Sequence, residues 1–179
     1  MVNFFIRSIF LFVVVVFQMS FLNVVSANTF ANAILATAIA LTLTRGFSVA
    51  WPWIVGLGCL FDILSLDIVG ITALILIVFS YGISFLSRRF LVEHKESGML
   101  LAVLFMMVSS VVYFPILWIL RHFIFGIAFS FNSLHVYVST LNIVYGMMLN
   151  ASLFVVMYIL TSKMHHILDF YEERVIVKR

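Results

Sequence analysis

The chain has 179 residues, of which 65% are hydrophobic and only 9% are charged, and its formal net charge is +3. Because a soluble domain carries about 25% charged residues, this composition excludes a water-soluble globular protein. The basic residues stand between hydrophobic runs and form no patch, which argues against nucleic-acid binding. The single cysteine, Cys59, excludes an intrachain disulfide and offers no framework for a metal site.

Apolar residues form long runs, each close to the roughly 20 residues that a bilayer-spanning helix needs. The runs do not alternate between apolar and polar residues, as the strands of a membrane barrel would. We therefore predict an all-α membrane protein with a six-transmembrane-helix bundle over residues 1–162 and a short amphipathic cytoplasmic tail over 163–179. The expected spans are 8–25, 30–44, 51–66, 68–87, 98–120 and 136–160.

The stretch from Gly46 to Ser87 contains no basic residue and must hold two spans. A single helix of that length would measure about 60 Å, about twice the hydrocarbon thickness of a bilayer. The chain is therefore expected to fold back as a hairpin, with its turn at Ser65–Asp67. The first helix of the hairpin is expected to start near Trp51–Trp53, because Pro52 suits a first helical turn and tryptophan suits a membrane interface.

The basic residues indicate how the bundle is oriented. With six spans, both termini and the connections after the second and fourth spans lie on one side of the membrane. That side holds nine of the 10 lysines and arginines, and the other side holds only Arg121. Since cytoplasmic loops carry an excess of Lys and Arg, we expect both termini in the cytoplasm.

The N-terminal segment has a second interpretation. Arg7, the apolar run behind it and the small residues of Val25–Ala27 resemble a secretory signal peptide with its cleavage site. The apolar run is rather long for a signal peptide, and no secreted domain follows it. Cleavage would leave the rest of the topology unchanged.

Asp62 is an acid within the third expected span, and such residues usually face protein or water. It stands about one turn before the hairpin turn, which favours a place near the outer interface and a structural role in helix pairing or turn capping. A ligand- or ion-binding role and a partner-facing role stay open. Arg121 is expected to pair with Asp62 or Asp67 across helices, and a solvated interfacial arginine is the alternative.

Two further polar features are candidate contact sites. Arg45 ends the second span and is expected to anchor it by reaching toward the headgroups on the cytoplasmic side. One face of the sixth span carries small and polar residues, which mark helix–helix contacts in membranes, with a polar pocket as the alternative. These residues, at steps of three and four, are Ser139, Asn142, Gly146 and Asn150.

The tail from Lys163 places its apolar residues at helical spacing, with polar residues opposite them. It is interpreted as an amphipathic extension of the sixth span that lies on the membrane or docks a cytoplasmic partner. The adjacent His165 and His166 diverge around a helix and do not predict a metal site. The sequence contains no catalytic motif or phosphate-binding loop, so we expect neither enzymatic activity nor a cofactor.

The third and fourth spans carry a more specific pattern, G-x-x-x-D-x-x-S-x-x-x-x-G. Its residues are Gly58, Asp62, Ser65 and Gly70. Together with the preceding Arg45, the chain length, the helix count and the short tail, this pattern resembles the rod shape-determining protein MreD family over nearly the whole chain. Family members often open the second span with a Pro-Asn pair, whereas this chain has Ala31 and Asn32, which leaves the start of that span open.

The resemblance implies a non-enzymatic component of the bacterial cell-elongation (rod) complex in the inner membrane, which supports cell shape and peptidoglycan synthesis by binding partners. The implied partners are a bitopic MreC-like protein, an MreB-like filament and a peptidoglycan-synthase pair, besides membrane lipid. The family also looks like the substrate-binding subunits of energy-coupling-factor transporters, which implies a six-helix bundle that can enclose a cavity. The alternative function is therefore a vitamin-like small-molecule binding subunit of a membrane transporter, with a pocket lined by Asp62 and the asparagines of the sixth span.

Overall fold

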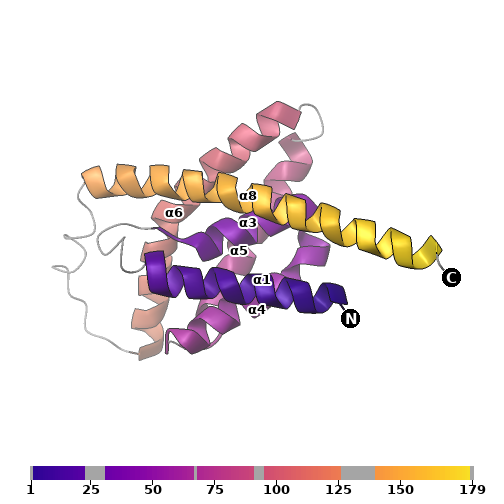
Figure 1. Ribbon diagram of the computed structural model, residues 1–179. Coiled ribbons are helices and arrows are strands. Elements are labelled where there is room, and N and C mark those ends of the chain that lie inside the picture. Colours follow the sequence, from indigo (N-terminus) through magenta and orange to yellow (C-terminus); the bar gives the residue numbers. More distant parts are fainter. Residues whose placement is uncertain (1, 23–30, 67, 91–94, 126–139, 178–179) are drawn as a thin grey trace.

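The computed structural model describes residues 2–22, 31–66, 68–90, 95–125 and 140–177. Within these ranges the chain forms helices and no β-strand, which confirms the predicted all-α fold. The elements are α1 (Val2–Phe17), the π-helical turn η1 (Gln18–Leu22), α3 (Ala33–Arg45), α4 (Phe47–Leu64), α5 (Ile71–Phe90), α6 (Lys95–Phe125) and α8 (Thr140–Val177). They gather into one bundle (Figure 1).

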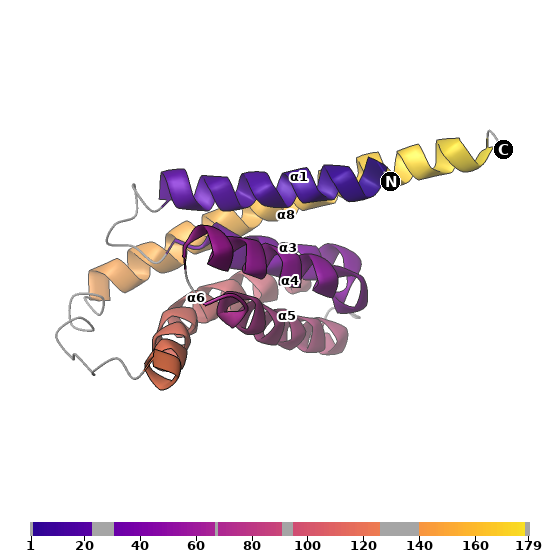
Figure 2. The same ribbon diagram turned by 90° about the horizontal axis from the view of Figure 1, so that it is seen from below.

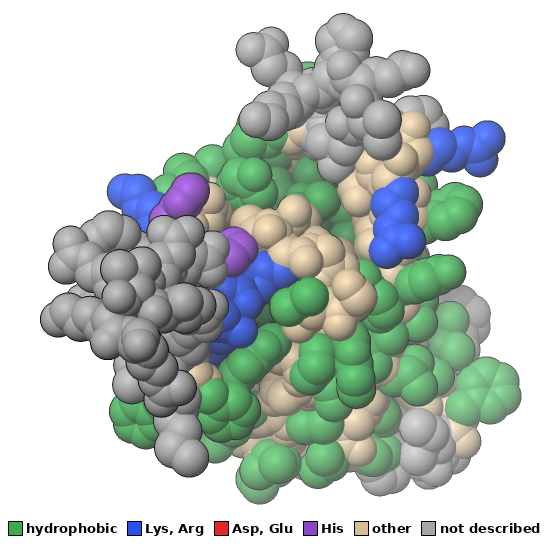
Figure 3. Space-filling model, turned by 90° about the vertical axis from the view of Figure 1, so that its right-hand side faces the viewer, with side chains coloured by type: hydrophobic (Ala, Val, Ile, Leu, Met, Phe, Trp, Pro, Cys, Tyr) green, Lys and Arg blue, Asp and Glu red, His purple; other side chains and the backbone are tan. Residues whose placement is uncertain are grey.

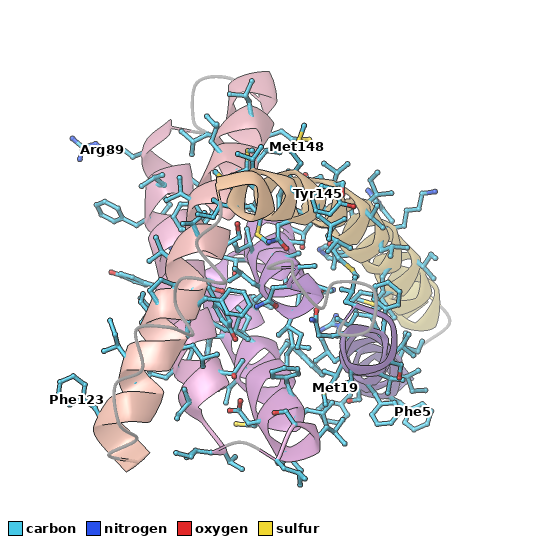
Figure 4. All side chains as sticks on the ribbon, turned by 90° about the vertical axis from the view of Figure 1, so that its left-hand side faces the viewer. Phe5, Met19, Arg89, Phe123, Tyr145 and Met148 are labelled. Atoms are coloured by element: carbon cyan, nitrogen blue, oxygen red, sulfur yellow. The ribbon has the colours of Figure 1, made fainter. Side chains whose placement is uncertain are left out.

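The outside of the bundle is apolar. Figure 4 shows Phe5, Phe123 and Met148 pointing away from it, and each of these side chains is mostly exposed. Four helical stretches among the described residues are long and apolar enough to cross a membrane, namely Phe47–Leu64, Ile71–Arg89, Met99–Leu117 and Ile143–Leu168. Shorter apolar helices are Phe4–Ser20 and Ala33–Arg45. An apolar surface of this extent suits lipid and not water, so the chain is an all-α membrane protein.

Helix α3 occupies the centre of the bundle and contacts α1, α4, α5, α6 and α8. Figure 2 shows it below α1 and α8 and above α5. Every residue from Ala33 to Thr42 is buried, as expected for a helix that is apolar on all sides, and the many alanines let neighbouring backbones approach closely. The hydroxyls of Thr37 and Thr42 donate to carbonyl oxygens one turn back, at 2.7 and 2.8 Å, so burial leaves them hydrogen-bonded.

Helices α4 and α5 form the predicted hairpin, and the chain reverses between Leu64 and Ile71. The start of α4 differs from the prediction. The helix begins at Phe47, directly after Gly46 ends α3, so Pro52 lies inside α4 rather than in its first turn. Inside a helix, proline cannot donate to the carbonyl four residues back, here that of Ser48, and its ring crowds that carbonyl. Transmembrane helices tolerate this because neighbouring groups can satisfy the freed carbonyl. Pro52 therefore does not mark the start of this helix.

The start of α1 and the end of α8 lie at the same end of the bundle (Figures 1 and 2). α8 continues without a break from its membrane-length part, Ile143–Leu168, to Val177, and its last turns project past the other helices (Figure 1). The expected tail is thus the last part of this one helix. Its side chains from Asp169 onward lie outside the described ones.

Helices α4 and α5 approach each other closely at Gly58. A Cβ atom added there would stand 2.6 Å from the backbone nitrogen of Ala73, well inside van der Waals contact. Gly56 lies on the same helix, but nothing lies within 4 Å of the corresponding position. Small residues allow such close contacts between membrane helices, and only Gly58 is placed to provide one here.

Gly58→Ala is expected to lower the thermal stability of the detergent-solubilised protein, because the two helices must separate to admit a methyl group. Overpacking of this kind costs about 1–3 kcal/mol. Gly56→Ala is the matched control, and it should leave the unfolding midpoint unchanged or raise it, because alanine favours a helix by about 1 kcal/mol over glycine. Thermal unfolding followed by circular dichroism measures both midpoints. An equal effect of the two substitutions would contradict the close α4–α5 contact.

Candidate functional site

The first turn of α3 lies inside the protein, where residues 31–36 are all buried. The first N–H groups of a helix have no partner within the helix, and lipid offers none. Asn32 caps the helix itself, because its Oδ1 accepts from the Leu35 N–H at 2.9 Å. The N–H of Asn32 in turn donates to Oδ1 of Asn150 on α8, at 2.7 Å. The start of α3 is therefore satisfied by side chains.

Gln18 makes further contacts with the same turn from the end of the first helix. Its Nε2 donates to the Ala31 carbonyl at 3.1 Å, and its Oε1 accepts from the Ala33 N–H at 2.7 Å. Gln18 opens the π-helical turn η1, and single π-helical turns often occur at functional sites. This one side chain thus satisfies a carbonyl and an N–H group that are both buried.

Tyr113 extends these contacts from α3 to α5. It is buried on α6, and its side chain lies close to those of Asn32 and Thr72. Asp62 lies in the same region. The polar side chains of six elements therefore meet in one buried set of contacts, which we call the α3-cap network. Its members are Gln18, Asn32, Asp62, Thr72, Tyr113 and Asn150.

Asp62 is completely buried in protein. Its Oδ2 accepts from the backbone N–H of Gly70 at 2.7 Å and from that of Thr72 at 3.2 Å. These N–H groups lie at the start of α5, where the helix dipole favours a negative charge, so the carboxylate caps that helix. Its other oxygen, Oδ1, has no hydrogen-bond partner among the described residues.

The other residues of the glycine–aspartate pattern serve the same hairpin. Ser65 ends α4, and its hydroxyl donates to the carbonyl oxygen of Asp62 at 3.2 Å. Gly70 has a φ of +105°, a conformation that residues with a side chain rarely adopt, and its N–H reaches Asp62 from this position. With Gly58 packed on Ala73, every residue of the pattern has a defined place in the α4–α5 hairpin.

Arg45 lies at the opposite end of α3 from the cap network. Its Nη2 donates to Nδ1 of His165 on α8, at 3.1 Å. The contact holds the last turn of α3 against α8. The sequence predicted Arg45 only as an anchor to the headgroups, and its contact with His165 was not expected.

Several predicted site residues cannot be placed. The backbones of Arg121 on α6 and Asn142 on α8 are described but their side chains are not, and Asp67 and Ser139 lie outside the described residues. The pairing of Arg121 with an acid therefore stays a prediction. On the predicted face of the sixth span, Asn150 is buried and meets α3 through its hydrogen bond to Asn32.

Sequence reasoning missed Gln18, Thr72 and Tyr113 as site residues. Their positions far apart in the chain give no spacing that would link them, because they meet only through helix packing. Gln18 did carry a signal, since a polar residue within an apolar span usually faces the bundle interior. The open question of where the second span begins is answered by Asn32, a favoured residue type for a helix cap.

Comparison of the chain with family models, curated proteins and solved structures finds no match. In the part of the chain that the structure describes, no group of three or more His, Cys, Asp or Glu side chains could hold a metal ion. The site is therefore defined by its geometry: a set of buried polar side chains that bond to backbone groups at the starts of α3 and α5 and hold the helices in register.

Because Asp62 accepts two backbone hydrogen bonds, substitution by asparagine and substitution by leucine should affect the thermal stability differently. Asp62→Asn is expected to keep the fold, because its amide oxygen can accept from the N–H groups of Gly70 and Thr72. Asp62→Leu leaves both donors buried without an acceptor, at a cost of about 1–3 kcal/mol for each. Thermal unfolding in detergent should therefore rank the leucine variant well below the asparagine variant. Equal midpoints would mean that Asp62 does not cap α5.

Proposed function

We propose that this protein is a non-enzymatic integral component of the bacterial cell-elongation (rod) complex, of the rod shape-determining MreD type. It crosses the inner membrane six times, with both termini in the cytoplasm. It supports cell shape and peptidoglycan synthesis by binding partner proteins in the membrane, first among them a bitopic MreC-like protein.

The observation that carries this proposal is the construction of the α4–α5 hairpin. The pattern on which the resemblance rests coincides with a set of structural contacts. Gly58 seats α5 against α4, Asp62 caps α5, and Gly70 provides the turn. These residues hold the two helices of the hairpin together and do not line an open binding site. Such a structural role suits a protein that acts by binding partners through its surface.

The outer surface supports binding in the plane of the membrane. Helix α5 carries an apolar stripe at steps of three and four, and each of its side chains is more than half exposed. The stripe consists of Leu74, Val78, Tyr81 and Phe85. Helix α1 carries a similar stripe that includes Phe5 and Phe12. Such faces pack against lipid or against the helix of a partner, so a partner can reach them from the side.

The arrangement of helix ends supports the six-span topology. The first part of α1, the end of α3 and the part of α8 around Met164 lie near one another, since Arg7, Arg45 and Met164 line a common pocket. An even number of crossings places both termini on one side, and the excess of Lys and Arg assigns that side to the cytoplasm. α3 alone measures about 20 Å, which is less than the roughly 30 Å thickness of the hydrocarbon layer. The start of α3 therefore lies inside the bundle, where it contacts the α3-cap network.

Affinity capture of the full chain from mild detergent tests the proposal. The expected result is co-purification of a bitopic MreC-like protein. A photo-crosslinking amino acid at Tyr81 and, separately, at Phe12 should join the partner at one of these outward positions. Ile83 is completely buried two residues beyond Tyr81, so a crosslinker there is the matched control and should give no product with another protein.

One result would overturn the proposal. If the captured protein held no elongation partner, gave no protein crosslink at either outward position and retained a vitamin-like molecule, it would be a transporter subunit and not a scaffold.

A further inference from the structure

The turn between α4 and α5 exposes apolar side chains. Leu66 is 94% exposed, and three neighbouring apolar side chains are 42% to 57% exposed. We call these four residues the hairpin tip: Ile63, Leu64, Leu66 and Val69. Turns that stand in water favour glycine, proline, asparagine, aspartate and serine. An exposed cluster of large apolar side chains instead marks a contact with lipid or with another protein.

Leu66 also has a strained backbone. Its φ is +55°, a left-handed conformation that is costly for leucine and that glycine or asparagine adopts more readily. Because its side chain is almost fully exposed, Leu66 gains little burial within the protein to offset this strain. An apolar environment outside the protein provides that burial.

The backbone N–H groups of the turn favour lipid over water as this environment. Those of Ser65, Leu66 and Ile71 donate to carbonyl oxygens three or four residues back, at 2.8 to 3.3 Å. Two more, at the start of α5, donate to the carboxylate of Asp62. A turn in water can leave such groups to the solvent, whereas hydrocarbon provides no acceptor. These five donors therefore meet the requirement that lipid sets.

The lengths of the two helices place the hairpin tip near the edge of the hydrocarbon layer. α4 has 18 residues and α5 has 20, which correspond to about 27 and 30 Å. The hydrocarbon layer of a bilayer is about 30 Å thick. Neither helix therefore reaches far beyond this layer when its other end lies at the headgroups.

The other ends of these helices carry the residue types found at headgroup level. Trp53, near the start of α4, lines a pocket together with Arg7 and Arg45, and Arg88 and Arg89 stand in the last turn of α5. Figure 3 looks at the end of the bundle where the termini lie, and basic and histidine side chains gather there. Tryptophan and long basic side chains prefer the membrane interface. This end thus fixes the level of the hairpin in the membrane.

We propose that the hairpin tip inserts among the acyl chains of the leaflet opposite the chain termini, just below the lipid headgroups. The sequence also places Asp67 in this turn, and a charged residue favours the edge of the acyl chains over the centre of the bilayer. The hairpin tip is therefore a lipid-binding surface. This inference rests on the membrane-spanning fold and holds whichever proteins the bundle contacts.

Electron paramagnetic resonance of a nitroxide label measures the depth of the turn. The label is attached to the full chain at Leu66→Cys or, separately, at Val69→Cys, after Cys59→Ala has removed the single native thiol. The vesicles contain equal amounts of phosphatidylethanolamine and phosphatidylglycerol. Oxygen concentrates in hydrocarbon, whereas a water-soluble nickel complex stays outside it. The ratio of oxygen to nickel collisions should therefore be higher at both tip positions than at the matched control, Arg89→Cys, an exposed position at the other end of α5.

Two results would overturn the proposal. The first is a collision ratio at both tip positions that is no higher than at the Arg89 position, which would place the turn in water. The second comes from a photo-crosslinking amino acid at Leu66 in cells that produce the full chain. No product with another protein is expected there, and a discrete product of this kind would assign the hairpin tip to a protein partner instead of lipid.

Discussion

Backbone N–H groups at the start of a helix need acceptors, and hydrocarbon supplies none. Because α3 begins inside the bundle, its acceptors must come from the protein. Asn32 supplies one from the cap position, Gln18 another from η1, and Asn150 accepts from the cap residue itself. A helix of this length is marginal on its own in water. The first turn of α3 is therefore complete only when η1 and α8 are packed around it, which couples the formation of the central helix to the assembly of the bundle.

The two ends of α3 carry different chemistry. At its start, the side-chain amides of Gln18, Asn32 and Asn150 bond to backbone groups. Tyr113 lies close to Asn32 and Thr72, and Asp62 accepts from the Thr72 N–H. At its end, about 20 Å away by helix length, the cation of Arg45 lies beside Arg7 in an apolar pocket. The first arrangement fixes the helices relative to one another, as a scaffold for partners requires.

The sequence predicts the coarse fold because the length of each apolar run, compared with the thickness of a bilayer, determines where a spanning helix can form. Apolar runs near the thickness of a bilayer indicated helices, and the stretch from Gly46 to Ser87 had to fold back because it is too long for one span. The start of α4 was misplaced because Pro52 is tolerated inside the helix. The α3-cap network was beyond prediction, since Gln18 and Asn150 lie far apart in the chain and meet only after the helices have packed. Asp62 was found because a carboxylate in an apolar span stands out.

Hydrogen–deuterium exchange of the full chain in lipid nanodiscs tests the buried start of α3 most directly. The amides of residues 32–36 are either bonded to side chains or enclosed in the core, so they should exchange as slowly as those of residues 37–42. The residues around Gly46, where α3 ends at an exposed position, provide a faster reference within the same chain. Fast exchange at 32–36 beside slow exchange at 37–42 would show that α3 begins at a solvated surface, and it would contradict the account.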